Sequence, residues 1–210
     1  SSGLVGQQLV NKLIQNHSYQ KIKLFVRKKP NMQNPKIEII ETTFDNPELL
    51  STKIKGDDCF FCIGTTKKNS PNNLEYKRIE LDLPKKIAHL AKRNGVQSFI
   101  FISSGYANSK SSGDYLRYKG LVEEELIYLK FKNLGILRPS FLVGSRKVKR
   151  IGELIGISIF QVLSPLMIGP LKKIRPIKVE SVANAMIKIA QLSLKQVIFE
   201  SDEIVKLNQN

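Results

Sequence analysis

Two nearly uninterrupted apolar runs constrain the fold of this chain more than any other feature. They are Cys59–Ile63 (CFFCI) and Gln97–Ile102 (QSFIFI). Apolar strands without polar alternation are typical of a parallel sheet whose two faces are both covered by helices. Between the two runs, Leu74–Asn94 has helical periodicity, and Pro84 is expected to kink this helix or to mark a boundary in it. The order strand, helix, strand predicts the α/β class.

The same alternation continues along the whole chain. Further strands are expected at Lys21–Arg27, Ile37–Glu41, Gly135–Arg138, near Arg175–Val179 and at Val197–Glu200. Further helices are expected at Gly6–Gln15, Asn46–Ser51 (brief, with Asp45 as its cap), Gly113–Lys132 and Ser181–Leu194. With 210 residues and no low-complexity linker, the sequence predicts one doubly wound, Rossmann-like domain over 1–210, in which 145–210 form a small substrate-side region.

The net charge is unusual, because 34 Lys and Arg stand against 18 Asp and Glu, which gives +16. Such an excess is compatible with nucleic-acid or anionic-membrane binding. However, the chain has no basic tail and no aromatic-flanked basic motif, so we interpret the charge as a solvated lysine-rich surface and expect no nucleic-acid partner. The tightest basic cluster, Arg146–Arg150, is a candidate for binding an anionic group of a small-molecule substrate.

Cysteine and histidine usage excludes several classes of protein. Two cysteines, Cys59 and Cys62, cannot build a disulfide framework, and together with two histidines they are too few for a zinc site. Their C-x-x-C spacing lies on a predicted strand, where side chains three positions apart point to opposite faces. We therefore predict no metal and no redox role for this pair. Because no signal peptide is recognisable, we expect a cytoplasmic protein.

The uncharged stretch 154–171 must be considered as a membrane segment. A spanning helix needs about 20 apolar residues, whereas this stretch is shorter and contains Pro165 and Pro170. We predict a buried helix followed by a loop, with peripheral membrane contact as the lesser alternative.

The chain opens with SSGLVG directly ahead of a predicted helix. Gly3 and Gly6 match the last two glycines of a G-x-x-G-x-x-G phosphate loop, in which a glycine lets the backbone approach a pyrophosphate at a helix N-terminus. This predicts a dinucleotide site, and the residues expected to contact the cofactor here are Ser2, Gly3, Leu4 and Val5. In such sheets the strand that feeds this loop is central. We therefore expect a short apolar strand and a glycine to precede Ser1 in the natural chain.

The next strand carries the signal for cofactor type. NAD-selective sites place an Asp or Glu about 20 residues beyond the loop, on the ribose 2′-hydroxyl. Here the strand end reads FVRKK, with Arg27 and Lys28 and no acid. These cations suit a 2′-phosphate, so the sequence favours NADP(H) over NAD(H).

A serine, a tyrosine and a lysine form the candidate catalytic set. Tyrosine and lysine four apart occur at four places, so spacing alone decides nothing: Tyr19/Lys23, Tyr106/Lys110, Tyr115/Lys119 and Tyr128/Lys132. Only Tyr115 and Lys119 begin a helix that follows a strand ending near a serine, Ser104. A phenol holds its proton until about pH 10 in water, and a neighbouring ammonium favours the phenolate. Ser104 would hydrogen-bond the reacting oxygen while Tyr115 transfers its proton.

These motifs together resemble the atypical (extended-type) short-chain dehydrogenases/reductases, and more narrowly the HIV-Tat-interacting-protein-like oxidoreductases and small proteins called nucleoside-diphosphate-sugar epimerases. The matching pieces cover nearly the whole chain: SSGLVG, FVRKK, FFCIGTT, FIFISSG, YLRYKG and LRPSFLVG. The resemblance implies that Ile63, Gly64 and Thr65 line the cofactor groove. It also implies that Pro139 and Ser140 contact the nicotinamide end and that Lys119 binds the cofactor ribose.

Three functions remain open from the sequence. The leading one is an NADP(H)-dependent oxidoreductase that acts on a small carbonyl or alcohol through Ser104, Tyr115 and Lys119. Epimerase or dehydratase chemistry on a nucleotide sugar is disfavoured, because few residues follow Arg138 to build a sugar-nucleotide pocket. A non-catalytic NADP(H)-binding regulator is the third, since a fold does not determine a function.

Overall fold

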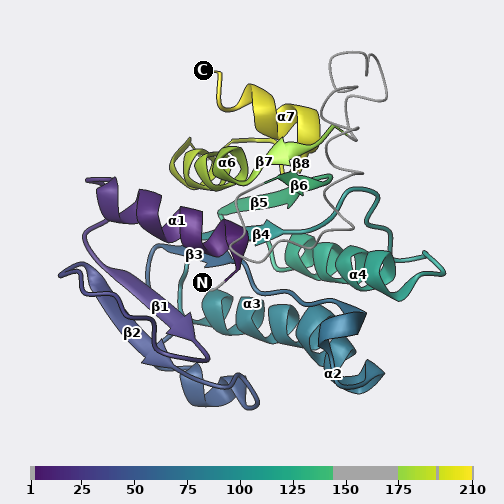
Figure 1. Cartoon of the computed structure of the whole chain (residues 1–210), viewed down its shortest axis with the longest axis horizontal. Coiled ribbons are helices and arrows are strands. Elements are labelled where there is room, and N and C mark those ends of the chain that lie inside the picture. Colours follow the sequence, from purple (N-terminus) through teal and green to yellow (C-terminus); the bar gives the residue numbers. More distant parts are fainter. Residues whose placement is uncertain (1–2, 144–174, 193, 210) are drawn as a thin grey trace.

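The computed structural model describes residues 3–143, 175–192 and 194–209. Its main sheet has the spatial order β3 (Asp58–Phe61), β4 (Ser98–Ile102), β5 (Asn133–Arg138) and β8 (Ile198–Glu200), as Figure 1 shows. A second sheet pairs β1 (Ile22–Val26) with β2 (Ile37–Glu41), and a third pairs β6 (Leu142–Val143) with β7 (Ile177–Lys178). Every strand pair is parallel, as the apolar runs predict.

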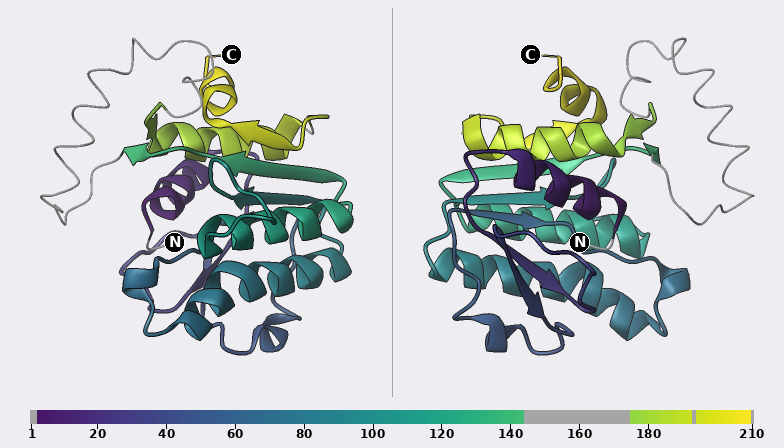
Figure 2. Two further views of the ribbon diagram at one scale, coloured as in Figure 1. Left: turned by 90° about the vertical axis from the view of Figure 1, so that its right-hand side faces the viewer. Right: turned by 60° about the vertical axis from the view of Figure 1, so that its left-hand side comes forward.

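Helices cover both faces of the main sheet (Figure 2). On one face lie α1 (Leu4–Gln15), α6 (Val179–Leu192) and α7 (Ser201–Lys206), and on the other lie α3 (Leu83–Arg93) and α4 (Asp114–Tyr128). The alternation of β4 shows why both layers are needed. Phe99 and Phe101 are buried in the cluster with α3 and α4, whereas Ile100 is buried in the cluster with α1 and α6. The predicted doubly wound, Rossmann-like fold is therefore confirmed.

The position between β1 and β3 is open. No strand of the described residues pairs with the facing edges of β1 and β3, and a cavity of about 800 Å³ lies between them, lined by residues such as Leu9, Leu24 and Phe61. This is the central position of the order 3-2-1-4-5-6. It is also where the sequence places the strand expected before Ser1, and the existence of that strand stays a prediction.

The open edge explains one difference from the expectation. The run CFFCI was expected to be buried on both faces, yet Cys59 and Phe60 in β3 are only partly buried. The equivalent positions of β4 are fully buried, because β4 has a neighbouring strand on each side.

The predicted helix Leu74–Asn94 is divided into three pieces. They are α2 (Asn73–Lys77), a π-helical turn η3 (Arg78–Asp82) and α3. Pro84 stands in the first turn of α3, next to the boundary between η3 and α3. Hydrophobic periodicity could not show the π turn, because the apolar positions continue through it.

Three smaller elements also differ from their expected form. The helix at Asn46–Ser51 is a short 3-10 turn, η1 (Pro47–Leu50), and its cap is Asn46 rather than Asp45, with the Glu48 N–H donating to Asn46 Oδ1 over 3.2 Å. A further 3-10 turn, η2 (Lys67–Asn69), follows β3. The helix at Gly113–Lys132 ends at Tyr128, since Lys130 adopts a positive φ of 50° and turns Phe131 into the core.

None of the helices in the described ranges has the length and apolar character needed to cross a membrane. The stretch 154–171 and the cluster Arg146–Arg150 lie outside the described residues.

Candidate functional site

The predicted site residues come from neighbouring strand ends. Ile63–Thr65 follow β3, Ser104 follows β4, and Pro139 follows β5. In a parallel sheet the carboxyl ends of neighbouring strands meet at one edge, which is where doubly wound folds bind ligands. The structure therefore brings these three segments to the same edge of the sheet.

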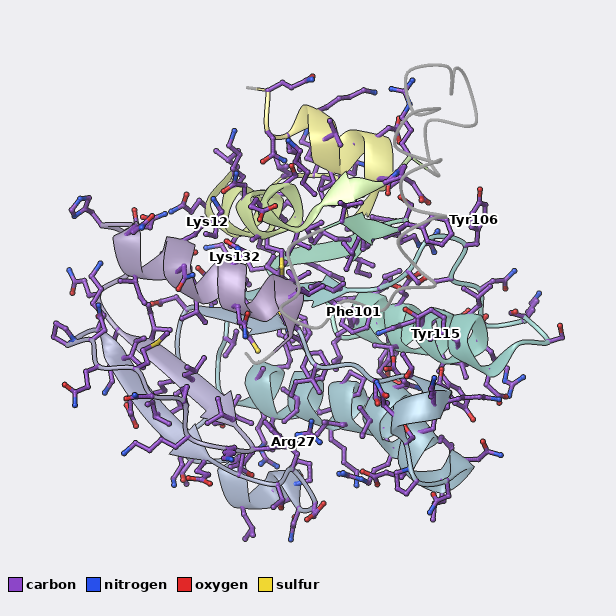
Figure 3. The ribbon with its side chains drawn as sticks, in the orientation of Figure 1. Lys12, Arg27, Phe101, Tyr106, Tyr115 and Lys132 are labelled. Carbon is purple, nitrogen blue, oxygen red and sulfur yellow. The ribbon has the colours of Figure 1, made fainter. Side chains whose placement is uncertain are left out.

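Lys119 projects from α4 to the carboxyl end of β4. Its side chain is buried, and Nζ donates a hydrogen bond to the Ile102 carbonyl oxygen over 3.3 Å. Nζ also lies 4.9 Å from the centre of the Phe101 ring and 5.9 Å from the centre of the Tyr115 ring. Figure 3 labels Phe101 on β4 and Tyr115 on α4. A buried cation thus lies beside the tyrosine that the sequence selects.

Tyr115 itself is open to solvent, with 40% of its surface exposed in the first turn of α4. The tyrosines of the other three candidate pairs are placed differently. Tyr19 donates its hydroxyl proton to Asp58 over 2.8 Å at the opposite end of β3, and burial together with Asp58 raises its pKa. Tyr106 and Tyr128 are 66% and 75% exposed. Among these four pairs, all within the described ranges, the ring-to-ammonium approach is found at Tyr115 and Lys119.

Ser104 lies in a loop that is fastened to the turn carrying Tyr115. Asn108 donates its backbone N–H to Leu116 O over 3.0 Å, and Ala107 donates to Ser104 O over 3.1 Å. Ser104 is partly exposed, whereas its neighbour Ser103 is buried and donates its hydroxyl to Glu123. Of the two serines, Ser104 is therefore the one with access to a ligand.

Glu80 is a residue of the site that the sequence did not indicate. It lies in η3 with 1% of its surface exposed, and its Oε2 is 3.0 Å from Lys119 Nζ. Its Oε1 accepts a hydrogen bond from the Thr65 backbone N–H. A signal was available, because a lone acid on the buried stripe of a predicted helix requires a cation nearby. The sequence could not identify which lysine supplies it.

The N-terminus of α1 has the properties of an anion site. Gly3 is the N-cap residue, no side chain caps the helix, and the first turn carries no acid. Among the described residues, a Cβ added at Gly3 would meet nothing within 4 Å beside the first turn, which includes Leu4 and Val5. The backbone N–H groups of a helix N-terminus and the helix dipole attract anions such as the phosphates of a dinucleotide. Ser2 lies outside the described residues.

The remaining predicted cofactor contacts divide into two groups. Arg27 and Lys28 follow β1 with exposed side chains (Figure 3 labels Arg27), so both cations are accessible. Ser140 is engaged within the protein, because its N–H donates to Ser201 Oγ over 2.6 Å and its hydroxyl donates to Arg175 O. Pro139 is buried, and its carbonyl accepts from Gly105 N over 3.1 Å. The nicotinamide contacts of these two residues stay predictions.

The C-x-x-C pair is structural. Cys59 packs against the cluster of α3 and α4, and Cys62 packs against the cluster of α1 and α6, so the two side chains point to opposite faces. Both are free thiols, and no group of His, Cys, Asp and Glu in the described part of the chain could hold a metal ion.

Both thiols are expected to resist alkylation in the native protein. Burial raises the pKa of Cys59 and of Cys62 to about 12, so about one thiol in ten thousand is ionised at pH 8, and only the thiolate reacts. Iodoacetamide labelling at pH 8, followed by mass spectrometry, should be far slower in buffer than in urea. Equally fast labelling in both conditions would contradict the raised pKa values of these two partly buried thiols.

Comparisons with known proteins agree with this geometry. Residues 1–150 match the family model described as NAD(P)H-binding. "Protein FMP52-1, mitochondrial" of Scheffersomyces stipitis is 33% identical over 153 residues, which cover 71% of this chain and 68% of that protein. "Protein HTATIP2" of Rattus norvegicus is 31% identical over 159 residues, which cover 73% of this chain and 64% of that protein.

Solved structures show the same fold at low sequence identity. The Bordetella bronchiseptica enzyme WbmH, in complex with NAD+, has a TM-score of 0.69 and 14% identity, with coverage of 94% of this chain and 71% of that one. The UDP-N-acetylglucosamine 4-epimerase of Methanobrevibacter ruminantium has a TM-score of 0.64 and 20% identity, with coverage of 93% and 72%. These two likenesses establish the fold alone.

The comparisons correct one expectation and confirm another. The prediction of a cytoplasmic protein is wrong, because yeast relatives that are 28–34% identical are named mitochondrial proteins. That prediction rested on the lack of a recognisable signal peptide, which does not distinguish one intracellular compartment from another. The family resemblance is confirmed by the matching model and by the relatives. The chain belongs to the NAD(P)H-binding family, in agreement with its resemblance to the atypical short-chain dehydrogenases/reductases.

Proposed function

We propose that this protein is an NADP(H)-dependent oxidoreductase that reduces a small carbonyl compound, or oxidises the corresponding alcohol, at Ser104, Tyr115 and Lys119. The observation that carries the proposal is the buried Lys119 ammonium, 5.9 Å from the centre of the solvent-accessible Tyr115 ring at the ligand-binding edge of the sheet. Ammonium groups are seldom removed from water. The burial of Lys119 at this edge of the sheet therefore favours a functional role for this side chain.

Each side chain of the set has a chemical task. Ser104 donates a hydrogen bond to the reacting oxygen of the substrate and so orients it. The Tyr115 hydroxyl gives a proton to that oxygen during reduction and takes one during oxidation. The Lys119 ammonium stabilises the phenolate that remains after the proton has left Tyr115. Bound NADP(H) supplies or accepts the hydride.

The cofactor would be held by groups from three elements. The first turn of α1 binds the pyrophosphate through its N–H groups, beginning at Gly3. Ile63, Gly64 and Thr65, in the loop after β3, would line the groove for the adenosine and nicotinamide halves, and the Lys119 ammonium would bind a ribose hydroxyl. Arg27 and Lys28 neutralise the 2′-phosphate, which makes NADPH the preferred form.

The function is tested by following NADPH oxidation with a panel of small aldehydes and ketones. We expect at least one compound to be reduced, with NADPH consumed in a one-to-one ratio to the alcohol formed. A chain that binds NADPH tightly and reduces none of a broad panel would instead be a non-catalytic NADP(H)-binding protein.

Cofactor preference gives a separate prediction. At a concentration about 100 times the dissociation constant, a ligand stabilises the folded state by roughly 2.7 kcal/mol. We therefore expect NADPH to raise the melting temperature more than NADH does at equal concentration. Replacing Arg27 and Lys28 together with serine should remove most of that difference.

The matched control removes two other cations. Lys12 and Lys132 lie away from Arg27 in Figure 3, so replacing both with serine lowers the net charge equally without touching the predicted phosphate contacts. This control should keep the preference for NADPH. Equal shifts with NADPH and NADH in the unmodified protein would refute the assignment of Arg27 and Lys28.

A further inference from the structure

Glu80 connects two parts of the site that are far apart in sequence. One carboxylate oxygen lies 3.0 Å from Lys119 Nζ on α4, and the other accepts the backbone N–H of Thr65, in the loop after β3. The same oxygen would lie 3.2 Å from a Cβ added at Gly64, so the loop backbone passes directly over the carboxylate. One side chain therefore contacts both the predicted ribose-binding lysine and the predicted cofactor loop.

The local backbone explains how Glu80 reaches this position. It lies in the π-helical turn η3, between α2 and α3, and π turns widen a helix by one residue and recur at functional sites. The turn packs against α4, as the Glu80–Lys119 contact requires, and Glu80 is 1% exposed. A regular helix through the same residues would direct the side chain elsewhere, because each residue adds about 100° of rotation.

The Glu80 carboxylate and the Lys119 ammonium each need the other, because both are removed from water. Side-chain exposure is 6% for Lys119 and 1% for Glu80, so both groups are removed from water. A buried charge is tolerated only when it is paired and hydrogen-bonded. In the described part of the chain, Glu80 Oε2 forms an ion pair with Lys119 Nζ at 3.0 Å without hydrogen-bond geometry, and Oε1 accepts the Thr65 N–H.

We propose that Glu80 is a positioning residue that holds the Lys119 ammonium and the Gly64–Thr65 backbone at one fixed separation, ready for the cofactor. The inference rests on the proposed function, in which Lys119 binds the cofactor ribose. A free lysine side chain has many rotamers, and binding would have to select one of them. Because Glu80 and Ile102 O already hold Nζ, that selection is made before the cofactor arrives.

The test is a double-mutant cycle on NADPH affinity, read from the fluorescence of bound NADPH and independent of turnover. Glu80→Gln removes the charge that holds Lys119 and keeps an oxygen that can accept from Thr65. We expect it to raise the dissociation constant about tenfold, as loss of a partner does for metal ligands that it orients. In a Lys119→Met background the same change should have no further effect, since Glu80 acts through Lys119.

A matched control separates positioning from general loss of stability. Glu123 is also a buried acid paired with a cation, Arg138, and is 3% exposed, yet it contacts neither Lys119 nor Thr65 in the interactions described. Glu123→Gln should lower the melting temperature and leave the NADPH dissociation constant within about twofold. The proposal is overturned if both variants weaken NADPH binding equally, or if Glu80→Gln is additive with Lys119→Met.

The outcomes distinguish this inference from the proposed function. If Lys119→Met leaves NADPH affinity unchanged, the role given to Lys119 fails, and the inference fails with it. If Lys119→Met weakens binding but folded Glu80→Gln does not, only the inference fails. Should Glu80→Gln not fold, Glu80→Asp takes its place, because it keeps the charge and withdraws the carboxylate by one methylene. Unchanged NADPH affinity in folded Glu80→Asp would also overturn the proposal.

Discussion

Replacing Tyr115 with phenylalanine is expected to lower turnover by a factor of roughly 10² to 10⁴, the contribution typical of a positioned acid–base group. The substitution removes the hydroxyl and leaves the ring beside Lys119, so packing is retained. Because 40% of Tyr115 is exposed, the folded state should lose little stability. The measurement is the steady-state rate with the best carbonyl substrate of the panel, together with the NADPH dissociation constant, which should stay within about twofold.

The control for this experiment is Tyr106→Phe. Tyr106 also precedes a lysine by four residues and follows the serines closely, but it is 66% exposed. Its hydroxyl should therefore be dispensable. If Tyr115→Phe retained full turnover, or if Tyr106→Phe lost as much, the acid–base role would belong elsewhere. Loss of turnover with NADPH binding intact in Tyr115→Phe alone is the expected pattern.

Gly120→Ala is expected to destabilise the protein by about 2–4 kcal/mol, at the upper end of overpacking effects. Gly120 is buried in α4, where an added Cβ would lie 2.2 Å from Ser109 N and 2.4 Å from Asn108 C. Both are backbone atoms, so no side chain can rotate to make room. The helix and the loop after β4 must separate, and the Asn108–Leu116 hydrogen bond stretches with them.

Urea denaturation measures this effect as a shift of the unfolding midpoint. Gly113→Ala is the matched control, since its added Cβ would have Ser111 Oγ at 3.8 Å as its nearest neighbour, an ordinary contact. It should leave the midpoint nearly unchanged. Because the loop carries Ser104, Gly120→Ala should also lower turnover in the fraction that remains folded. A midpoint equal to that of Gly113→Ala would mean that α4 does not pack on this loop as described.

Short-range chemistry explains why much of the fold could be predicted. Apolar runs such as CFFCI and QSFIFI are typical of strands in a parallel sheet covered on both faces, so the α/β class followed from the residues. The same holds for the start of α1 after Gly3, where a glycine before a helical pattern leaves N–H groups open to an anion. Element ends were less predictable, because Lys130 and Asn46 act through backbone conformation and capping, which periodicity does not report.

In the candidate site, too, the features with a local sequence pattern were predictable and the others were not. Its nearest-neighbour features, Tyr115 four residues before Lys119 and Arg27 beside Lys28, are visible in the sequence, because helices and strands repeat at known periods. Glu80 was not visible as a partner of Lys119, since 39 positions separate them and a π turn sets the direction of the carboxylate. The close packing of the Ser104 loop on α4 was not visible either, since it depends on the missing side chain of Gly120.

By itself, then, the sequence determined the α/β class, the family and the identity of the acid–base candidates, because those follow from patterns within a few helical turns or one strand. Tertiary structure alone decided that Lys119 is buried against Glu80, and that Ser103 is buried with its hydroxyl on Glu123 while Ser104 stays partly exposed. The physical reason is that burial and ion pairing depend on which distant segments meet, and such meetings leave no local pattern of residues.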